Sequence, residues 1–270
     1  MIDSPLLPSL GGYINGAWQM ADTGDTVAVS NPANADHLAD VAAMGGAETR
    51  RAIAAAEAAQ ARPNDLDQRR RWLEAIAAAL TGEREEIGRI LCLEHGKPLA
   101  EAQGEVDYAA GFFRYAAAHI DALAPHTLDE RPRDCTWHVH HRPAGVVGLI
   151  TPWNFPIGMI AKKLSAAIAA DCASVIKPSS KTPLTMIALF TLLEREVGLP
   201  AGRVNLVMGR AGPITEALFE APSVRVISFT GSTEVGRTLI EQSAAGVKRL
   251  TLELGGNAPY IIFDDADLDH

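Results

Sequence analysis

Residues 146–156 read VVGLITPWNFP, an apolar run followed by a turn that lies between two prolines. A short run without polar residues is typical of a strand that is buried on both faces. Pro152 and Pro156 fix φ on either side of the turn, and Pro156 suits the first turn of a helix. We therefore expect a buried strand at 146–150 that leads through a stiff turn into a helix.

The chain beyond this turn alternates between apolar runs and helical patterns. Further strands are expected near 174–176, 204–207, 225–229, 248–254 and 260–263. Helices are expected near 156–170, 183–197, 214–219 and 233–243. This alternation predicts an α/β fold with a doubly wound, Rossmann-like parallel sheet, in which ligands bind at the carboxyl ends of the strands.

The segment before residue 146 shows other patterns. Asn15-Gly16 lies between short apolar runs and predicts a hairpin. Residues 48–126 have a helical period with three breaks, so we expect a layer of alanine-rich helices that packs against the sheet. Residues 135–141 alternate between apolar and polar side chains, which predicts a half-exposed strand.

The composition limits the classes of partner. The 270 residues carry 24 basic and 33 acidic side chains, and the net charge of −9 argues against a nucleic-acid or anionic-membrane surface. No apolar run approaches the roughly 20 residues of a membrane span, and the first residues lack the pattern of a signal peptide. Cys92, Cys135 and Cys172 form no CxxC pair, so we expect no disulfide framework and a cytoplasmic location. His138 and His140 share a strand face without a carboxylate or cysteine to complete a ligand set, so no metal is expected.

Residues 229–236, FTGSTEVG, follow an apolar strand and begin a helix. Gly231 lets the backbone turn sharply and approach a ligand closely. The helix N-terminus offers N–H groups and partial positive charge to a pyrophosphate. The alternative is a helix capped by Ser232 or Thr233 without a ligand. Alone the motif is weak, because it lacks the spacing of the GxGxxG fingerprint.

Four segments at strand ends together resemble the NAD(P)-dependent aldehyde dehydrogenase superfamily, most closely its succinate-semialdehyde dehydrogenase-like branch: residues 151–156, 177–180, 229–236 and 252–257. The resemblance runs from Tyr13 to Asp269 and covers the N-terminal, cofactor-binding portion of the family. It implies a hairpin and helical layer at 13–133, the strand of an oligomerisation arm at 134–145, and a Rossmann-like core at 146–270. A homo-oligomer is therefore expected for the complete enzyme.

The resemblance also implies a site for NAD or NADP. Lys177 would face the adenosine ribose. The family often has an acidic residue at the place of Ser180, which repels a 2′-phosphate, so serine between Lys177 and Lys181 should allow NADP+. A solvated lysine pair is the alternative. The residues implied around the cofactor are Ile150, Thr151, Pro152, Trp153, Lys177, Ser179, Ser180, Gly209, Gly212, Phe229, Thr230, Gly231, Ser232, Val235, Glu253, Leu254 and Gly255.

Two catalytic residues are implied as well. Asn154, on the stiff turn, would donate a hydrogen bond to the substrate's carbonyl oxygen as negative charge develops there. An ordinary turn asparagine is the alternative. Glu253 would be the general base that activates the water releasing the acyl group. The alternative for Glu253 is a strand-terminal glutamate paired with a lysine.

Lys162 and Lys163, in the helix after the turn, are possible substrate residues. Lys163 matches a lysine found widely near the active site of the family. At the place of Lys162 the semialdehyde branch usually has an arginine that binds the substrate carboxylate. Lysine keeps the charge but loses the bidentate fork, so an acidic semialdehyde is one alternative among aldehyde substrates.

The family reaction uses a cysteine thiolate, which attacks the aldehyde and carries the acyl group as a thioester. Cys92 in the helical layer, Cys135 on the arm and Cys172 in the turn before a strand do not fit this thiolate, which would lie beyond His270 in a complete enzyme. Two hypotheses follow. The chain is either the cofactor-binding part of an aldehyde-oxidising enzyme, inactive alone, or a catalytically inactive NAD(P)-binding or assembly module. An acyl-phosphate or acyl-CoA reductase is less favoured, because Glu253 suits water as the acyl acceptor.

Overall fold

A seven-stranded sheet forms the centre of the molecule, which is described by a computed structural model over residues 2–129 and 132–267. The strands lie in the order β11 (Arg249–Leu254), β10 (Val224–Gly231), β7 (Val146–Ile150), β8 (Ser174–Lys177), β9 (Val204–Leu206), β1 (Gly12–Ile14) and β2 (Ala17–Gln19). The strands from β7 to β11 are parallel, whereas β1 pairs antiparallel with β9 and β2. The predicted α/β fold with a mostly parallel sheet is confirmed.

The direction of winding reverses at β7. From β7 the chain adds β8 and β9 on one side, and it then crosses back to add β10 and β11 on the other side. In doubly wound sheets, the crevice at such a switch point is where ligands bind. The hairpin predicted at Asn15-Gly16 joins β1 to β2, and both residues have the positive φ that a type I′ turn requires.

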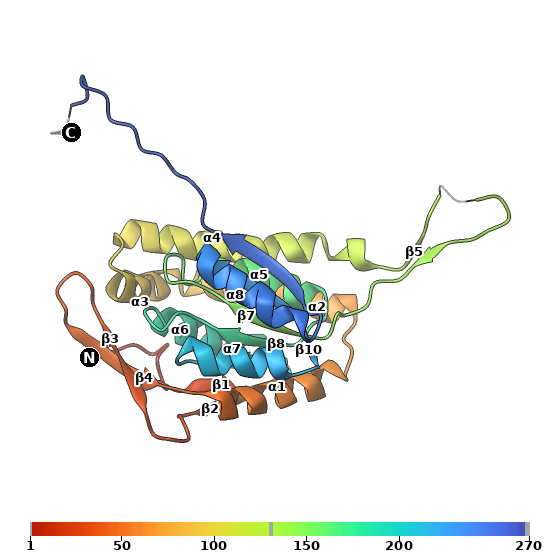
Figure 1. The fold of residues 1–270 in the computed structure, drawn as a ribbon, viewed down its shortest axis with the longest axis horizontal. Coiled ribbons are helices and arrows are strands. Elements are labelled where there is room, and N and C mark those ends of the chain that lie inside the picture. Colours follow the sequence, from red (N-terminus) through yellow and green to blue (C-terminus); the bar gives the residue numbers. More distant parts are fainter. Residues whose placement is uncertain (1, 130–131, 268–270) are drawn as a thin grey trace.

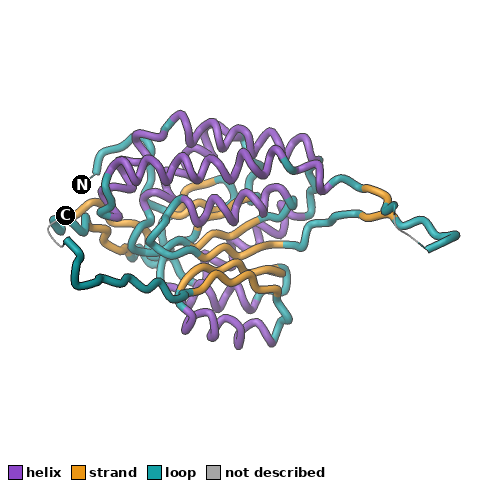
Figure 2. The backbone as a smooth tube through the Cα atoms, turned by 90° about the horizontal axis from the view of Figure 1, so that it is seen from above, coloured by secondary structure: helices purple, strands orange, loops and turns teal. Residues whose placement is uncertain are grey.

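Helices cover both faces of the sheet, as Figure 2 shows. Two helices follow β7 and β8, namely α5 (Gly158–Ala169) and α6 (Leu184–Leu192), which a π-helical turn at Leu193–Val197 extends. The other two follow β9 and β10, namely α7 (Ala211–Glu220) and α8 (Thr233–Ala244). Alternate side chains of β7 enter two different apolar cores, because successive residues of a strand point to opposite faces. The strand is buried on both faces, as predicted.

The N-terminal helices do not form the single layer that the sequence predicted. α2 (Leu66–Gly82), α3 (Arg84–His95) and α4 (Leu99–Ala118) share one core with α5 and α6. α1 (Gly46–Gln60) packs instead with α7 in the second core, where Ala52, Ile53 and Ala56 are buried. The small side chains of α1 allow this close packing, and their helical period carries no information about which face of the sheet they cover.

Two elements extend beyond the sheet. β3 (Thr26–Ser30) and β4 (His37–Ala42) form a hairpin that the sequence analysis did not predict, and the turn between them contains Asn31-Pro32. After a short 3₁₀ helix at Ile120–Leu123, β5 (His126–Thr127) and β6 (His138–Val139) form an arm that protrudes from the body in Figure 1. The strand expected at 135–141 is thus reduced to two residues.

The strand expected at 260–263 is wrong. Residues 255–263 have no regular secondary structure and leave the body beyond β11 in Figure 1. A run of β-branched and aromatic residues forms a strand only where another strand pairs with it, and none does so within the described part of the chain. In that same part, no helix is both long and apolar enough to cross a membrane.

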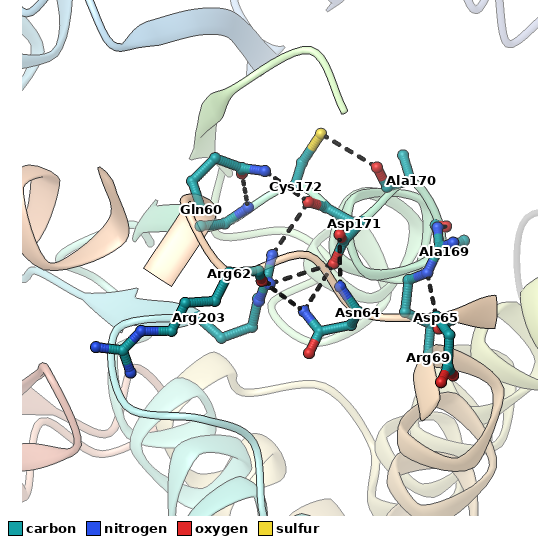
Figure 3. A network of polar contacts seen from close by, with 11 residues as sticks. Gln60, Arg62, Asn64, Asp65, Arg69, Ala169, Ala170, Asp171, Cys172 and Arg203 are labelled. Atoms are coloured by element: carbon teal, nitrogen blue, oxygen red, sulfur yellow. Dashed lines mark hydrogen bonds and ion pairs between the residues drawn. The ribbon is translucent and has the colours of Figure 1, made fainter. Parts of the chain in front are cut away.

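A buried polar network holds the amino end of β8 in place (Figure 3). Asp171 lies in the turn between α5 and β8 and pairs with buried Arg203 at 3.2 Å. Asn64, in the link between α1 and α2, donates from its backbone and side chain to the same carboxylate, at 3.0 and 2.9 Å. Gln60 donates to the backbone carbonyl of Asp171 at 2.9 Å and accepts from the amide of Ala173 at 2.7 Å. These bonds fix the strand whose other end carries Lys177.

Candidate functional site

The register of the parallel strands brings the predicted site residues into two rows at the carboxyl edge of the sheet. One row across β8, β7, β10 and β11 holds Lys177, Ile150, Phe229 and Leu252. The next row holds Glu253 opposite Thr230, with Thr151 directly after Ile150. Residues from four strands that are far apart in the sequence therefore meet on either side of the switch point.

Two buried threonine hydroxyls at this edge have no partner. Thr151 follows β7 and Thr230 lies near the end of β10, so the two side chains flank the switch point. Neither Oγ1 atom makes a hydrogen bond within the described residues. Leaving a buried hydroxyl unpaired costs about 1–3 kcal/mol, so both atoms are suited to accept or donate a hydrogen bond to a ligand.

Lys177 is buried at the end of β8, with 7% of its surface exposed. Across residues 2–129 and 132–267, no carboxylate or hydrogen-bond acceptor contacts its ammonium group. Burial lowers the pKa of Lys177 below its ordinary value. An ammonium that is buried without a partner is costly for folding and typical of a binding site for an anionic or hydroxyl-rich ligand.

The predictions for residues 229–236 both place a helix N-terminus after β10, with or without a bound pyrophosphate. α8 begins there. The Ser232 hydroxyl caps α8 by accepting from the amide of Val235 at 3.3 Å, so the predicted cap is present, and a cap of this kind does not decide whether a ligand binds. A helix of this length leaves further first-turn N–H groups for a ligand. A Cβ at Gly231 would meet the Phe229 ring at 2.3 Å, so only glycine fits between strand and helix.

Glu253 and Lys162 form an ion pair, with 2.6 Å between Oε1 and Nζ. The hydrogen bond from Lys162 lowers the pKa of Glu253, with a further contribution from Lys163. Lys163 is buried, donates to the Ser228 hydroxyl at 2.9 Å, and has a pKa lowered by burial. The alternative in which Glu253 pairs with a lysine is therefore seen, and its partner is the residue predicted to contact the substrate.

The turn at 151–156 presents Trp153, Asn154 and Phe155 on the surface, ahead of α5. Lys97 contacts this turn at the Asn154 carbonyl, and Glu105 accepts from the amide of Ile157 directly after it. Neither residue was predicted. The only sequence signals for them were the charge inside the break at 96–98 and a glutamate on a buried helix face. Ser228 was missed as well, because one serine in a strand carries no distinguishing pattern.

The remaining predicted cofactor residues lie around the two rows. Ser179 and Ser180 follow β8, and the adjacent Lys181 places its ammonium 5.4 Å from the centre of the Trp153 ring. Val235, Leu254, Gly255 and Pro152 border the same edge. Gly209 and Gly212 follow β9 outside these rows, and a Cβ on Gly209 would meet the carbonyl oxygen of Met44 at 2.1 Å. Gly209 therefore serves the close approach of two backbones.

A family model described as "Aldehyde dehydrogenase family" matches residues 18–270. The NADP(+) succinate-semialdehyde dehydrogenase GabD of Escherichia coli (strain K12) is 45% identical over 258 residues, which cover 95% of this chain and 53% of that protein. A glutarate-semialdehyde dehydrogenase of Pseudomonas putida is 44% identical over 263 residues and covers 95% of this chain and 54% of its own length. The crystal structure of an oxidoreductase from Marinobacter aquaeolei has a TM-score of 0.93 and 59% identity, and the match covers 100% of this chain and 57% of that one.

The fold and the site define a doubly wound α/β domain whose switch point carries a cation and two hydroxyls without partners among the described residues. The chain belongs to the aldehyde dehydrogenase family. It spans about half the length of the curated relatives it matches.

Proposed function

We propose that this chain binds NAD(P)+ as part of an enzyme that oxidises an aldehyde to a carboxylic acid through a cysteine thioester. The observation that carries the proposal is the set of unpartnered polar groups at the switch point: the ammonium of Lys177 and the hydroxyls of Thr151 and Thr230. A betaine aldehyde dehydrogenase of Staphylococcus aureus, solved in complex with NAD+, is structurally similar, with a TM-score of 0.89 and 34% identity. That complex supports a nucleotide site in the family fold.

The residues present fit a dinucleotide. Lys177 would hold the adenosine ribose, and the amides at the start of α8 would hold the pyrophosphate. The bound cofactor would supply the hydride acceptor. The chain's own side chains bind and orient the reactants and exclude water.

The substrate side of the site is proposed to include Asn154, Lys162 and Glu253. An apolar groove of about 770 Å³ between α4 and α5 contains Lys162, Tyr108 and Phe112 in its wall. An aldehyde with a carboxylate at its far end fits this groove, because Lys162 is the one lysine or arginine among the residues that line it. The names of two similar relatives, which are semialdehyde dehydrogenases, support this substrate class.

A preference for NADP+ is proposed from the loop after β8. Ser180 is exposed there, Lys177 and Lys181 flank it, and residues 178–182 contain no carboxylate. An acidic residue in this loop would repel a 2′-phosphate by about 1–4 kcal/mol at 4 Å, depending on the local dielectric.

We expect Ser180→Glu to lower the affinity for NADP+ by about tenfold or more and to leave NAD+ binding within a factor of about two. Titration calorimetry on the purified 270-residue chain measures both affinities. Ala118→Glu, which adds the same charge at an exposed position at the end of α4, should change neither. If wild type binds neither nucleotide, the proposed function fails for this chain. If Ser180→Glu binds NADP+ as well as wild type does, only the argument for cofactor preference fails.

A second candidate is an NAD(P)-binding or assembly module without chemistry of its own. It is favoured by the positions of the three thiols: Cys92 is in α3, Cys135 is on the arm, and Cys172 is buried at the amino end of β8. None lies in the two rows that hold Thr230 and Glu253. Aldehyde-dependent reduction of NADP+ by the purified chain would rule this candidate out.

We also propose that the arm pairs subunits in a homo-oligomer. Trp137, between β5 and β6, is about half exposed, and the arm protrudes from the body in Figure 1. Trp137→Ser should reduce any association seen by sedimentation without lowering the thermal stability of the body.

A further inference from the structure

A buried ion pair lies beneath the turn that carries Asn154. Lys97, between α3 and α4, places its Nζ 2.5 Å from Oε2 of Glu105, on the second turn of α4. The side chain of Lys97 is 9% exposed and that of Glu105 is 1% exposed. A buried pair of this kind adds little net stability compared with a well-packed apolar pair, so its presence calls for another role.

Lys97 contacts the turn directly, and Glu105 contacts the two residues that follow it. The Lys97 ammonium donates to the backbone carbonyl of Asn154 at 3.2 Å and lies 4.5 Å from the centre of the Phe155 ring. The second oxygen of Glu105 accepts from the amides of Ile157 and Gly158, at 2.9 and 3.0 Å. The pair therefore holds the turn at the Asn154 carbonyl and again at the start of α5.

We propose that Lys97 and Glu105 are positioning residues that fix the peptide unit after Asn154 and the two peptide units at the start of α5, and thereby the direction of the Asn154 side-chain amide. Apolar side chains of similar size would hold α4 against α5 equally well, but they would not orient a carbonyl or two amides. A donor that stabilises developing negative charge must be held in place before reaction, because reorganisation at that moment costs catalytic free energy. The contacts described here are the evidence for the orientation of Asn154, and its use in catalysis rests on the function proposed above.

Isotope labelling can resolve NMR signals from this turn in the 270-residue chain. Asn154-Phe155 is the only Asn-Phe pair among the 270 residues, so carbonyl-¹³C asparagine with ¹⁵N phenylalanine gives one cross-peak, from the Asn154 carbonyl. Ile-Gly pairs occur at 87–88 and 157–158, so a second sample with carbonyl-¹³C isoleucine and ¹⁵N glycine gives two cross-peaks, from the amides of Gly88 and Gly158. Of these, Gly158 reports the Glu105 bond, and Gly88 in α3 is an internal control.

The decisive variant replaces both charges, Lys97→Met with Glu105→Leu, so that no unpaired charge is left to unfold the chain. We expect the Asn154 carbonyl peak to shift and hydrogen exchange at Gly158 to become about ten- to hundred-fold faster, because a hydrogen bond to a charged group is lost. Exchange at Gly88 should not change. Lys97→Arg keeps the charge and should return the carbonyl peak close to its wild-type position.

Asp107→Asn is the matched control. Asp107 is also on α4 and pairs with Arg84 at 2.8 Å, but on the exposed surface away from the turn. This variant should move neither peak. An unshifted Asn154 peak with unchanged Gly158 exchange in the folded double variant would overturn the proposal, since the pair would then serve packing alone. NADP+ titration of wild type tests the proposed function separately, so the two can fail independently.

Discussion

Lys177 is buried at the carboxyl end of β8, where its ammonium lacks any counter-ion in the described structure. The positive charge of Lys177 should therefore favour nucleotide binding and destabilise the folded chain. We expect Lys177→Met to weaken NADP+ binding by about ten- to hundred-fold, because a charge-assisted hydrogen bond is lost. The same change should stabilise the chain by on the order of 1 kcal/mol. Titration calorimetry measures the effect on NADP+ binding, and urea unfolding measures the effect on stability.

The stabilising effect of Lys177→Met should depend on pH with a definite sign. Burial lowers the folded pKa of Lys177, so the unfolded chain binds this proton more strongly than the folded chain does. The unfavourable contribution of Lys177 is fully present below the lowered pKa, and it disappears as pH rises toward the ordinary value of 10.5. The difference in stability between the variant and wild type should therefore narrow as pH rises toward 10.5. A difference that grows with pH would contradict this account.

The Lys162–Glu253 pair connects substrate binding to the basicity of the proposed base. The hydrogen bond from Lys162 is the largest cause of the lowered pKa of Glu253. We expect Lys162→Met to raise that pKa, followed by carboxyl ¹³C NMR with Glu253→Gln to assign the signal. The effect on stability should be small, because both side chains are more than a third exposed and solvent screens the pair.

A substrate-like dicarboxylate should act on Glu253 in the same direction. Glutarate bound to Lys162 would compete with Glu253 for the ammonium, so it should raise the pKa of Glu253 in wild type and have no effect on it in Lys162→Met. An equal response in both chains would show that glutarate binds elsewhere.

Glu94 caps the start of α6. This buried glutamate at the end of α3 accepts from the amides of Leu184 and Thr185, at 2.7 and 2.8 Å, and from the Thr185 hydroxyl. Burial is the largest effect and raises the pKa of Glu94 to about 7. The folded chain therefore holds this proton more tightly than the unfolded chain, so the contribution to stability is full below 4.5 and is lost as pH rises through about 7.

We expect wild type to lose up to about 3 kcal/mol of stability, relative to Glu94→Gln, between pH 5 and pH 8. The variant should be less stable at pH 5, because its amide cannot accept every hydrogen bond that the carboxyl group accepts. Urea unfolding at several pH values gives the difference directly. Parallel pH profiles for the two chains would show that Glu94 does not titrate in this range.

Periodicity predicted the elements that depend on local sequence. The Asn15-Gly16 hairpin, β7 and the helix after Pro156 all lie close to their predicted positions, because turn chemistry and burial on both faces leave direct marks in the sequence. The predicted single layer of N-terminal helices and the predicted strand at 260–263 were wrong, because each depends on a tertiary partner that local patterns do not specify. The β3–β4 hairpin was missed for the same reason.

The residues at the strand ends could be predicted to lie together, whereas the ion pair that supports the turn beside them could not. Strand ends in a doubly wound sheet meet at one edge, so Lys177, Thr151 and Glu253 could be placed together from motifs. The ion pair of Lys97 with Glu105 depends on how α4 packs against α5. No spacing in the sequence reveals that arrangement, although it joins residues only eight positions apart.

β11 is an edge strand of the seven-stranded sheet. β11 pairs with β10 on one side and with no other strand in the described part of the chain, and it leads into a run of exposed apolar side chains: Tyr260 at 90%, Ile261 at 71%, Ile262 at 59% and Phe263 at 72%. An unpaired edge beside such a run favours strand-to-strand association. We expect light scattering to show concentration-dependent association of the chain. Ile261→Lys should move its onset to on the order of tenfold higher concentration, because burying one isoleucine contributes about 1.5–3 kcal/mol. Ala118→Lys adds the same charge away from this edge and should not change the onset. A chain that stays monomeric at high concentration, or an equal response to both substitutions, would show that this edge does not drive association.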